Sequence, residues 1–208
     1  MKLRLSVLAL LVLSVIAIPA LAQNDLYDNG PTNGDIDAYT INFGFIVSDN
    51  FQLSSPSTVN SLVFASWLFP GDVLESAEVS FTSEEFGGTV FFDQVVDFTQ
   101  SNCGGNSFGF NLCDQTGTFS GVNLNAGTYW VNLQNAVVNT GDPAYWDVNR
   151  GPSMASENSL GSIPSESFTI MGTANSTTTT GTTPEPSTLL LFASGLVGAI
   201  GVFWRKLL

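Results

Sequence analysis

Apolar and polar residues alternate with a period of two along much of the chain between residues 23 and 173. The clearest alternating runs are residues 39–47, 77–81, 90–98 and 129–133. Period-two alternation is typical of β-strands with one face turned toward a core. The run at 39–47 therefore predicts a strand whose aromatic side, with Phe43 and Phe45, points inward. A more continuous apolar run at 62–69 predicts a central strand buried on both faces.

Turn-forming residues separate these runs. Asn-Gly, Gly-Gly and Pro-Gly-Asp sequences stand between them, and no convincing amphipathic helix lies between residues 23 and 173. Many short strands at near-regular spacing predict an all-β fold, an antiparallel jelly-roll-like β-sandwich. This stretch of about 150 residues is an ordinary size for one domain.

The first 22 residues have the three parts of a secretory signal peptide. Lys2 and Arg4 precede an apolar run at 5–18, and Ala20 and Ala22 are the small residues of a cleavage site. The apolar run is shorter than the roughly 20 residues that a transmembrane helix needs. We therefore expect a signal peptide at residues 1–22 that is removed from an exported chain.

The C-terminal end has a different composition. Residues 174–183 form a polar, Thr-rich linker, which should be extended because it has almost nothing apolar to bury. Residues 187–204 are apolar apart from three hydroxyl residues, and Arg205 and Lys206 follow at once. As a helix, about 18 residues reach about 27 Å, enough for a thin bilayer. The two cations favour a cytoplasmic C-terminus, so the sequence predicts a single transmembrane helix with the domain facing outward.

Pro184, Glu185 and Pro186, followed by the apolar segment and then Arg205 and Lys206, resemble the sorting tail of the PEP-CTERM family of exported proteins. The resemblance covers residues 184–208 and lies in the order of these three parts. It implies recognition by exosortase, a membrane-embedded cysteine peptidase-transferase that removes the helix. It also implies delivery to the outer surface or extracellular matrix of a Gram-negative cell, often in connection with exopolysaccharide and biofilm.

The stretch 23–173 also resembles acidobacterial-type members of this group. The similar segments are residues 27–31, 127–130, 145–147 and 166–170. This resemblance supports an exported surface protein and implies no activity or ligand.

The charge between residues 23 and 183 is strongly one-sided. Arg150 is the only basic residue there, against seventeen acidic residues, for a net charge of −16. Nucleic acid is excluded as a partner, because its phosphates need Lys and Arg for neutralisation. Either solubility outside the cell or cation binding accounts for the acidic excess.

One acidic, Asn- and Gly-rich segment is a candidate calcium site. It contains Asp25, Asp28, Asp35 and Asp37. Calcium takes six to eight oxygen ligands of this kind, although the spacing is not that of an EF-hand and the same residue types also form turns. Calcium is the one cofactor that the sequence suggests.

Cys103 and Cys113 are the only cysteines, and an exported chain passes through an oxidising compartment. We therefore expect a disulfide between them, which should stabilise the folded state by about 2–3 kcal/mol. The chain has no histidine, which removes Ser-His triads and the usual zinc protease sites. Carboxylate pairs alone can serve a glycosidase, but with seventeen acids such pairs arise by chance. We expect no enzymatic activity.

Two functions remain open on the sequence. The first is a non-catalytic surface or matrix protein, and the second is a carbohydrate-binding module that acts in the exopolysaccharide. Trp67, Trp130 and Trp146 could stack on sugar rings, or they could lie in the core. An exposed, coplanar pair of tryptophans would favour the second function, and buried tryptophans would favour the first.

Overall fold

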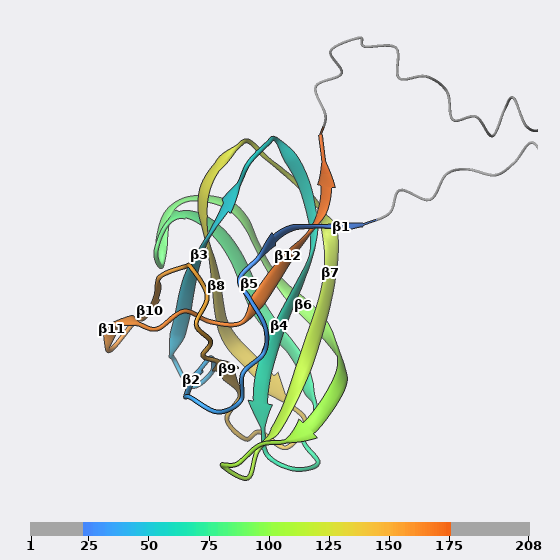
Figure 1. Cartoon of the computed structure of the whole chain (residues 1–208), viewed down its shortest axis with the longest axis vertical. Coiled ribbons are helices and arrows are strands. Elements are labelled where there is room, and N and C mark those ends of the chain that lie inside the picture. Colours follow the sequence, from blue (N-terminus) through green and yellow to red (C-terminus); the bar gives the residue numbers. More distant parts are fainter. Residues whose placement is uncertain (1–22, 176–208) are drawn as a thin grey trace, which may run out of the picture. The chain divides into compact units, whose positions relative to one another are not determined.

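The computed structural model describes residues 23–175, and every regular element in this part of the chain is a β-strand (Figure 1). The strands are β1 (Asn24–Asp28), β2 (Ala38–Thr40), β3 (Ile46–Leu53), β4 (Ser57–Leu68), β5 (Leu74–Glu84), β6 (Gly87–Gly105), β7 (Asn111–Leu124), β8 (Gly127–Val138), β9 (Tyr145–Asp147), β10 (Ala155–Glu157), β11 (Gly161–Ile163) and β12 (Phe168–Ala174). All of their pairings are antiparallel. No helix within residues 23–175 is long and apolar enough to cross a membrane.

The strands form one curled sheet in the order β1-β12-β4-β7-β6-β5-β8-β3-β10-β11, with β2 and β9 attached beside β4. The long strand β6 makes the curl, because its first part pairs with β5 and its last part pairs with β7. The sheet thus folds over itself into two layers (Figure 1). The all-β, antiparallel part of the sequence prediction is confirmed, while jelly-roll connectivity is not shown by this strand order and stays a prediction.

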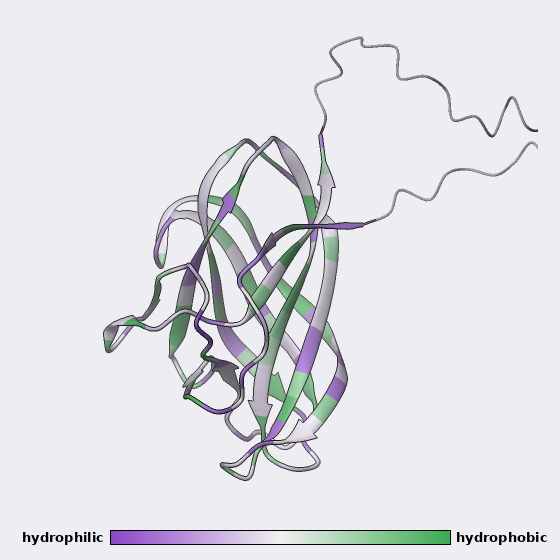
Figure 2. Ribbon diagram, viewed as in Figure 1, coloured by the Kyte–Doolittle hydropathy of each residue, from purple (hydrophilic) through white to green (hydrophobic). Residues whose placement is uncertain are grey.

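Aromatic side chains from both layers fill the space between them. Phe51 of β3 contacts Phe81 of β5 and Tyr27 of β1, with ring centroids 5.6 and 6.2 Å apart. Phe64 of β4 contacts the buried Trp146 of β9 at 5.9 Å. Apolar residues alternate with polar ones along the strands, as Figure 2 shows by hydropathy. Burial of these rings is the main source of stability, because aromatic side chains remove the largest apolar areas from water.

One predicted strand is wrong. Residues 39–47 are not continuous: β2 ends at Thr40 and β3 begins at Ile46. A turn lies between them, in which the amide of Phe45 donates to the carbonyl of Asn42 at 3.1 Å. Phe43 has φ of 59° and is 65% exposed, and Phe45 is 38% exposed. The alternation failed here because a left-handed turn reverses the chain and carries both aromatic rings outward.

The central strand at 62–69 is largely confirmed. It is the second half of β4, which lies between β12 and β7. Most of its residues from Leu62 to Leu68 are buried, but Phe69 lies past the end of the strand and is 39% exposed.

The two ends of the described chain lie side by side. In β1 and β12, Asn24 pairs with Gly172 and Asp28 with Thr169. After β1 the chain runs through a loop of residues 29–37 before it enters β2. The segment 148–154 after β9 and the segment 164–167 before β12 lie against this loop, since the amide of Asn149 donates to Ser165 and a side-chain amide of Asn149 donates to Asn29.

Candidate functional site

A cluster of buried polar side chains lies where these three segments meet the inner face of β3. We call it the polar cluster, and it comprises Asn29, Asp49, Asn149, Ser153, Ser165 and Glu166. All of these residues except Ser153 are buried, and Ser153 is half-buried. Buried polar groups at this density are costly unless they bond to one another, so their arrangement needs an explanation.

Asn29 lies at the centre of the polar cluster and is 0% exposed. Its Nδ2 atom has four oxygens within hydrogen-bond distance: Ser153 Oγ at 2.6 Å, the Glu166 carbonyl at 2.6 Å, Ser165 Oγ at 2.8 Å and Asp49 Oδ2 at 3.3 Å. Its Oδ1 atom accepts a hydrogen bond of 2.8 Å from the hydroxyl of Tyr27. Gly151 passes so close that a Cβ there would collide with the Asn29 carbonyl oxygen.

Asp49 is a carboxylate on the inward face of β3. It shares that face with Val47 and Phe51, and it is 0% exposed. Its Oδ2 atom accepts hydrogen bonds from the Glu166 amide at 2.8 Å and from the Ser153 hydroxyl at 2.9 Å. Burial raises the pKa of Asp49 from 3.8 to about 7, although these hydrogen bonds favour the charged form. Near neutral pH, Asp49 can therefore both accept and donate a proton.

Glu166 is more deeply isolated. It is 0% exposed, and neither of its carboxylate oxygens has a hydrogen-bond partner among the described residues. Burial raises the pKa of Glu166 well above 4.5, and the negative charges of Asp49, Asp147 and Asp37 raise it further. Both effects favour the neutral form of Glu166, and its side chain is shielded from solvent in this conformation.

Asp147 at the end of β9 is another fully buried carboxylate, at 0% exposure. It accepts hydrogen bonds from the Trp67 indole at 2.6 Å and from the amides of Asn33 and Gly34 at 2.7 and 2.9 Å. Burial raises the pKa of Asp147, while these three donors oppose the rise. These contacts fix the loop 29–37 and the Trp67 side chain of β4 to the same carboxylate. They also give the buried indole N–H of Trp67 a hydrogen-bond acceptor.

Two hollows flank the loop and share Asp28, Gly30, Pro31 and Thr32 in their walls. One has a volume of about 290 Å³ and lies over β4 and β12, and the other has a volume of about 550 Å³ and is lined by Arg150. Both hollows are open to solvent, so neither has the enclosed form of a small-molecule pocket.

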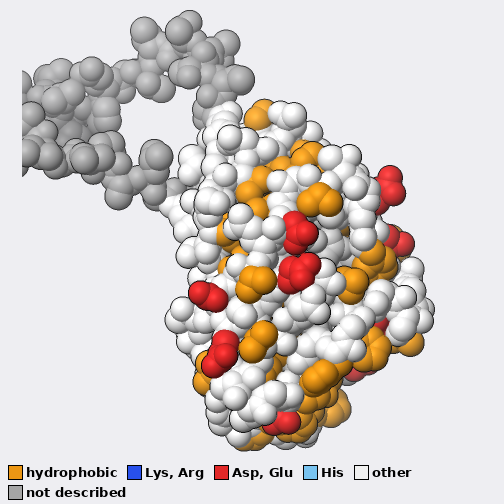
Figure 3. All heavy atoms as spheres, turned by 180° about the vertical axis from the view of Figure 1, so that it is seen from behind, with side chains coloured by type: hydrophobic (Ala, Val, Ile, Leu, Met, Phe, Trp, Pro, Cys, Tyr) orange, Lys and Arg blue, Asp and Glu red, His pale blue; other side chains and the backbone are white. Residues whose placement is uncertain are grey.

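The four residues of the predicted calcium site do not form a cluster. Asp25, Asp28, Asp35 and Asp37 are all exposed, and within residues 23–175 no three acidic, His or Cys residues are grouped to hold a metal ion. Asp28 accepts a hydrogen bond from the Gly30 amide, and Asp37 accepts one from the Ala38 amide. The interpretation as turn formers therefore fits the geometry better. On the face in Figure 3, acidic side chains also lie among apolar and uncharged ones.

The three tryptophans do not form an exposed platform. Trp146 is 0% exposed, Trp67 is 4% exposed, and Trp130 on β8 is half-buried. An aromatic surface exists beside Trp67, however. Phe108, 54% exposed, stacks on Trp67 with ring centroids 5.2 Å apart, and the exposed Phe69 lies 5.0 Å from Phe110.

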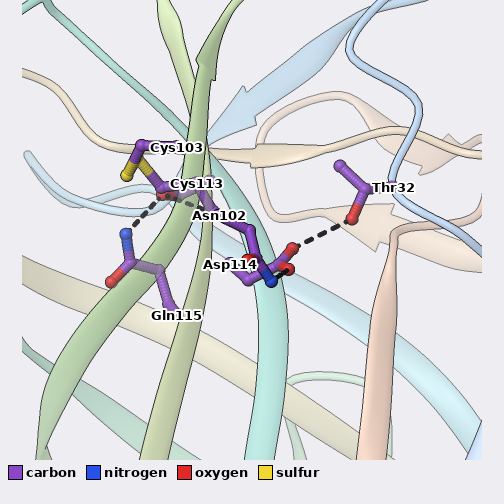
Figure 4. The surroundings of a disulfide bond; sticks show 7 residues. Thr32, Asn102, Cys103, Cys113, Asp114 and Gln115 are labelled. Atoms are coloured by element: carbon purple, nitrogen blue, oxygen red, sulfur yellow. Dashed lines mark hydrogen bonds between the residues drawn. A yellow bond between two sulfur atoms is a disulfide. The ribbon is translucent and has the colours of Figure 1, made fainter.

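The disulfide between Cys103 and Cys113 is confirmed, and it joins β6 to β7 near their hairpin end (Figure 4). Next to it, Asp114 accepts hydrogen bonds from Asn102 at 2.9 Å and from Thr32 at 3.2 Å. The disulfide hairpin is thereby connected to the loop 29–37 that borders the polar cluster.

The predicted sorting and cleavage residues lie outside the described residues. They are Ala20 and Ala22 at one end and Pro184, Glu185, Pro186, Arg205 and Lys206 at the other. Residues 182–206, however, match the PEP-CTERM protein-sorting motif. The chain carries a PEP-CTERM sorting motif. This motif marks an exported, surface-sorted protein and is the recognition signal for exosortase. The match does not extend into residues 23–175, and no curated protein matches the chain.

The sequence predicted the PEP-CTERM tail but not the polar cluster. One signal was present: Asp49 stands in phase with Val47, Phe51 and Leu53, so an acid occupies an inward position of a strand. Asn29 is 20 residues from Asp49 along the chain, and the remaining members are 100 or more residues from Asp49, so only the fold brings them together.

Proposed function

We propose that this is a non-catalytic exported protein of the cell surface or extracellular matrix, which exosortase sorts and processes through the PEP-CTERM tail. The observation that carries the proposal is the match of residues 182–206 to the sorting motif. The predicted signal peptide at 1–22 and the predicted transmembrane helix at 187–204 agree with this route. A Gram-negative outer surface and a link to exopolysaccharide and biofilm belong to the same proposal.

The features of residues 23–175 support a folded domain that works outside the cell. The disulfide suits an oxidising compartment. The acidic excess keeps the domain soluble at high local concentration, because like-charged molecules repel one another. The most perturbed carboxylates, Asp49 and Glu166, are 0% exposed and cannot contact a polymeric substrate in this conformation.

Intact-mass measurement of the protein from its own cells tests the sorting route. We expect a mature form without residues 1–22 and without the helix after Pro186. In cells without exosortase the helix should remain. Glu185→Ala should reproduce that defect, whereas Thr179→Ala in the linker should not. A mature form that keeps residues 189–208 in cells with active exosortase would contradict the proposal.

A carbohydrate-binding module is the second candidate, and the aromatic surface of Phe108, Phe69 and Phe110 favours it rather than the tryptophans. Ring faces that are held rigidly at a surface can stack on sugars. The amides of Phe108 and Phe110 both donate to Asn106 Oδ1 at 3.0 Å, which fixes the loop that presents Phe108.

A pull-down with the exopolysaccharide of the same cells tests this candidate. Phe108→Ala should weaken binding at least tenfold if stacking carries it. Phe43→Ala removes a ring that is at least as exposed, from the turn between β2 and β3, and should leave binding unchanged. Equal binding by both variants and the unmodified protein would reject the aromatic surface as the binding site.

A further inference from the structure

The carboxamide of Asn29 is held in an unusual environment. Its nitrogen carries two hydrogens but has four oxygens between 2.6 and 3.3 Å away. Two of these oxygens belong to serine hydroxyls, which are nucleophiles when a base removes their proton. A buried carboxamide packed against hydroxyl groups can therefore serve as an acyl group as well as a hydrogen-bond donor.

Ser153 lies next to this carboxamide. Its Oγ atom is 2.6 Å from Asn29 Nδ2. Since a carboxamide C–N bond is about 1.33 Å long, Ser153 Oγ lies within about 3.9 Å of the carboxamide carbon. Reacting atoms in near-attack geometry are about 3–3.5 Å apart and aligned. Ser153 Oγ now accepts a hydrogen bond from Nδ2, close to the carboxamide plane, so attack needs a rotation that turns the face of the carboxamide toward Ser153.

Ser153 also has a base. Its hydroxyl lies 2.9 Å from Asp49 Oδ2 and 2.9 Å from Ser165 Oγ and can donate its one hydrogen to either, and of these two only the Asp49 carboxylate can act as a base. The raised pKa of Asp49 suits an acid-base role near neutral pH. The other serine near Asn29 has no such partner. The Ser165 hydroxyl donates to the amide oxygen of Asn149 at 2.9 Å, and an amide oxygen cannot take its proton.

Tyr27 supplies the third element of the arrangement. Its hydroxyl donates to Asn29 Oδ1 at 2.8 Å. Negative charge develops on this oxygen when a nucleophile adds to the carbon, and a donor already in place stabilises it. Asn29 and Asp49 are both 0% exposed, so bulk water is kept from the reacting carbon.

We propose that Asn29 and Ser153 become joined by an intramolecular ester bond, which the folded domain forms by itself. The Ser153 hydroxyl gives its proton to Asp49 as its oxygen bonds to the carboxamide carbon of Asn29. The tetrahedral intermediate carries its negative charge on Asn29 Oδ1, opposite Tyr27. The bond from this carbon to Nδ2 then breaks, Asp49 returns the proton to the nitrogen, and ammonia leaves. One carboxamide and one hydroxyl thus give one ester and one ammonia, with no oxidant or cofactor.

The bond would close a loop of 124 residues, from the end of β1 to the segment before β10. It would hold the N-terminal strand covalently to the rest of the domain. This inference concerns residues 23–175 alone and does not depend on the sorting tail.

Trypsin offers a direct test. Arg150 is the only Lys or Arg between residues 5 and 204, so trypsin separates Asn29 from Ser153 by one cut. The disulfide cannot join the two products, because Cys103 and Cys113 both lie before the cut. The full chain is isolated from its own cells, unfolded, reduced, digested and weighed by mass spectrometry. We expect one linked product. Its mass should equal the summed masses of the two tryptic fragments minus the mass of one ammonia molecule. Hydroxylamine should separate it into two.

Ser153→Ala should give two separate fragments, which also proves that the cut at Arg150 is complete. Ser165→Ala is the matched control and should stay linked. Two fragments from the unmodified protein would overturn the proposal, as would a link that persists in Ser153→Ala. Loss of ammonia without a link would also overturn it, because ring closure between Asn29 and Gly30 has that result.

Discussion

Raising the pH from about 5 to about 8 should destabilise the folded domain, because burial raises the pKa of Asp49 and of Glu166, so these groups hold their protons more strongly in the folded state than in the unfolded chain. A carboxyl group whose folded pKa is raised contributes its full stability below the unfolded pKa, and this contribution is lost as the pH rises toward the folded pKa. For Asp49 that window runs from 3.8 to about 7. Each pH unit costs up to about 1.4 kcal/mol per group, and the cost falls off near the folded pKa, so Asp49 alone should remove about 2 kcal/mol between about pH 5 and about pH 7. Glu166 shifts in the same direction and adds to the loss.

Glu166→Gln isolates the effect of one group. Glutamine has the same shape and no charge, and the carboxylate oxygens of Glu166 have no hydrogen-bond partner to lose among the described residues. The variant should be more stable than the unmodified protein at about pH 8 and nearly equal at about pH 5. Glu157→Gln is a matched control, because Glu157 is also buried but accepts hydrogen bonds from Ser159 and Leu160. It should be destabilising at both pH values.

Urea unfolding of the mature protein, followed by tryptophan fluorescence at each pH, measures these differences as free energies of unfolding. A stability that stays level or rises between about pH 5 and about pH 8 would refute the reasoning. An unchanged pH dependence in Glu166→Gln would show that another group is responsible.

Three further outcomes are expected. Replacing Cys103 and Cys113 by Ala should lower the free energy of unfolding by about 2–3 kcal/mol, and thiol labelling of the unfolded, unreduced protein should give no signal. Trp67→Phe should cost about 1–3 kcal/mol in the same urea assay, because it leaves a buried carboxylate without its indole donor, whereas Trp130→Phe should cost less. Calcium should raise the melting temperature no more than sodium chloride of equal ionic strength, and a saturable calcium shift that Asp35→Ala abolishes would contradict this.

Strands were predictable from the sequence where the alternation of apolar and polar residues matches which side chains are buried. Val79 and Phe81 of β5, and Val131 and Leu133 of β8, lie in the core as their alternation predicts. The prediction failed at Phe43 because apolar and polar residues go on alternating in the sequence around it, while the backbone of Phe43 has a left-handed conformation. A period of two describes side-chain chemistry and does not report the backbone turn that interrupts a strand.

The polar cluster was not predictable for a different reason. Asn29 looks like a turn residue in its own segment, followed as it is by Gly30, and its partners are up to 137 residues distant. Glu166 likewise lies in an unremarkable polar stretch before β12. Local sequence reports propensity, but the burial of a charge depends on which segments fold over it, and that is a property of the whole chain.

The position of β12 has a mechanical consequence. The polypeptide that leads to the sorting tail continues from β12, which is flanked on both sides, by β1 and by β4. If the predicted C-terminal helix holds the protein at the membrane, a pull along this strand would load two rows of backbone hydrogen bonds at once. A tether that followed the edge strand β11 would load a single short row and could peel it away bond by bond. The chain therefore enters its tail from a part of the sheet that resists traction.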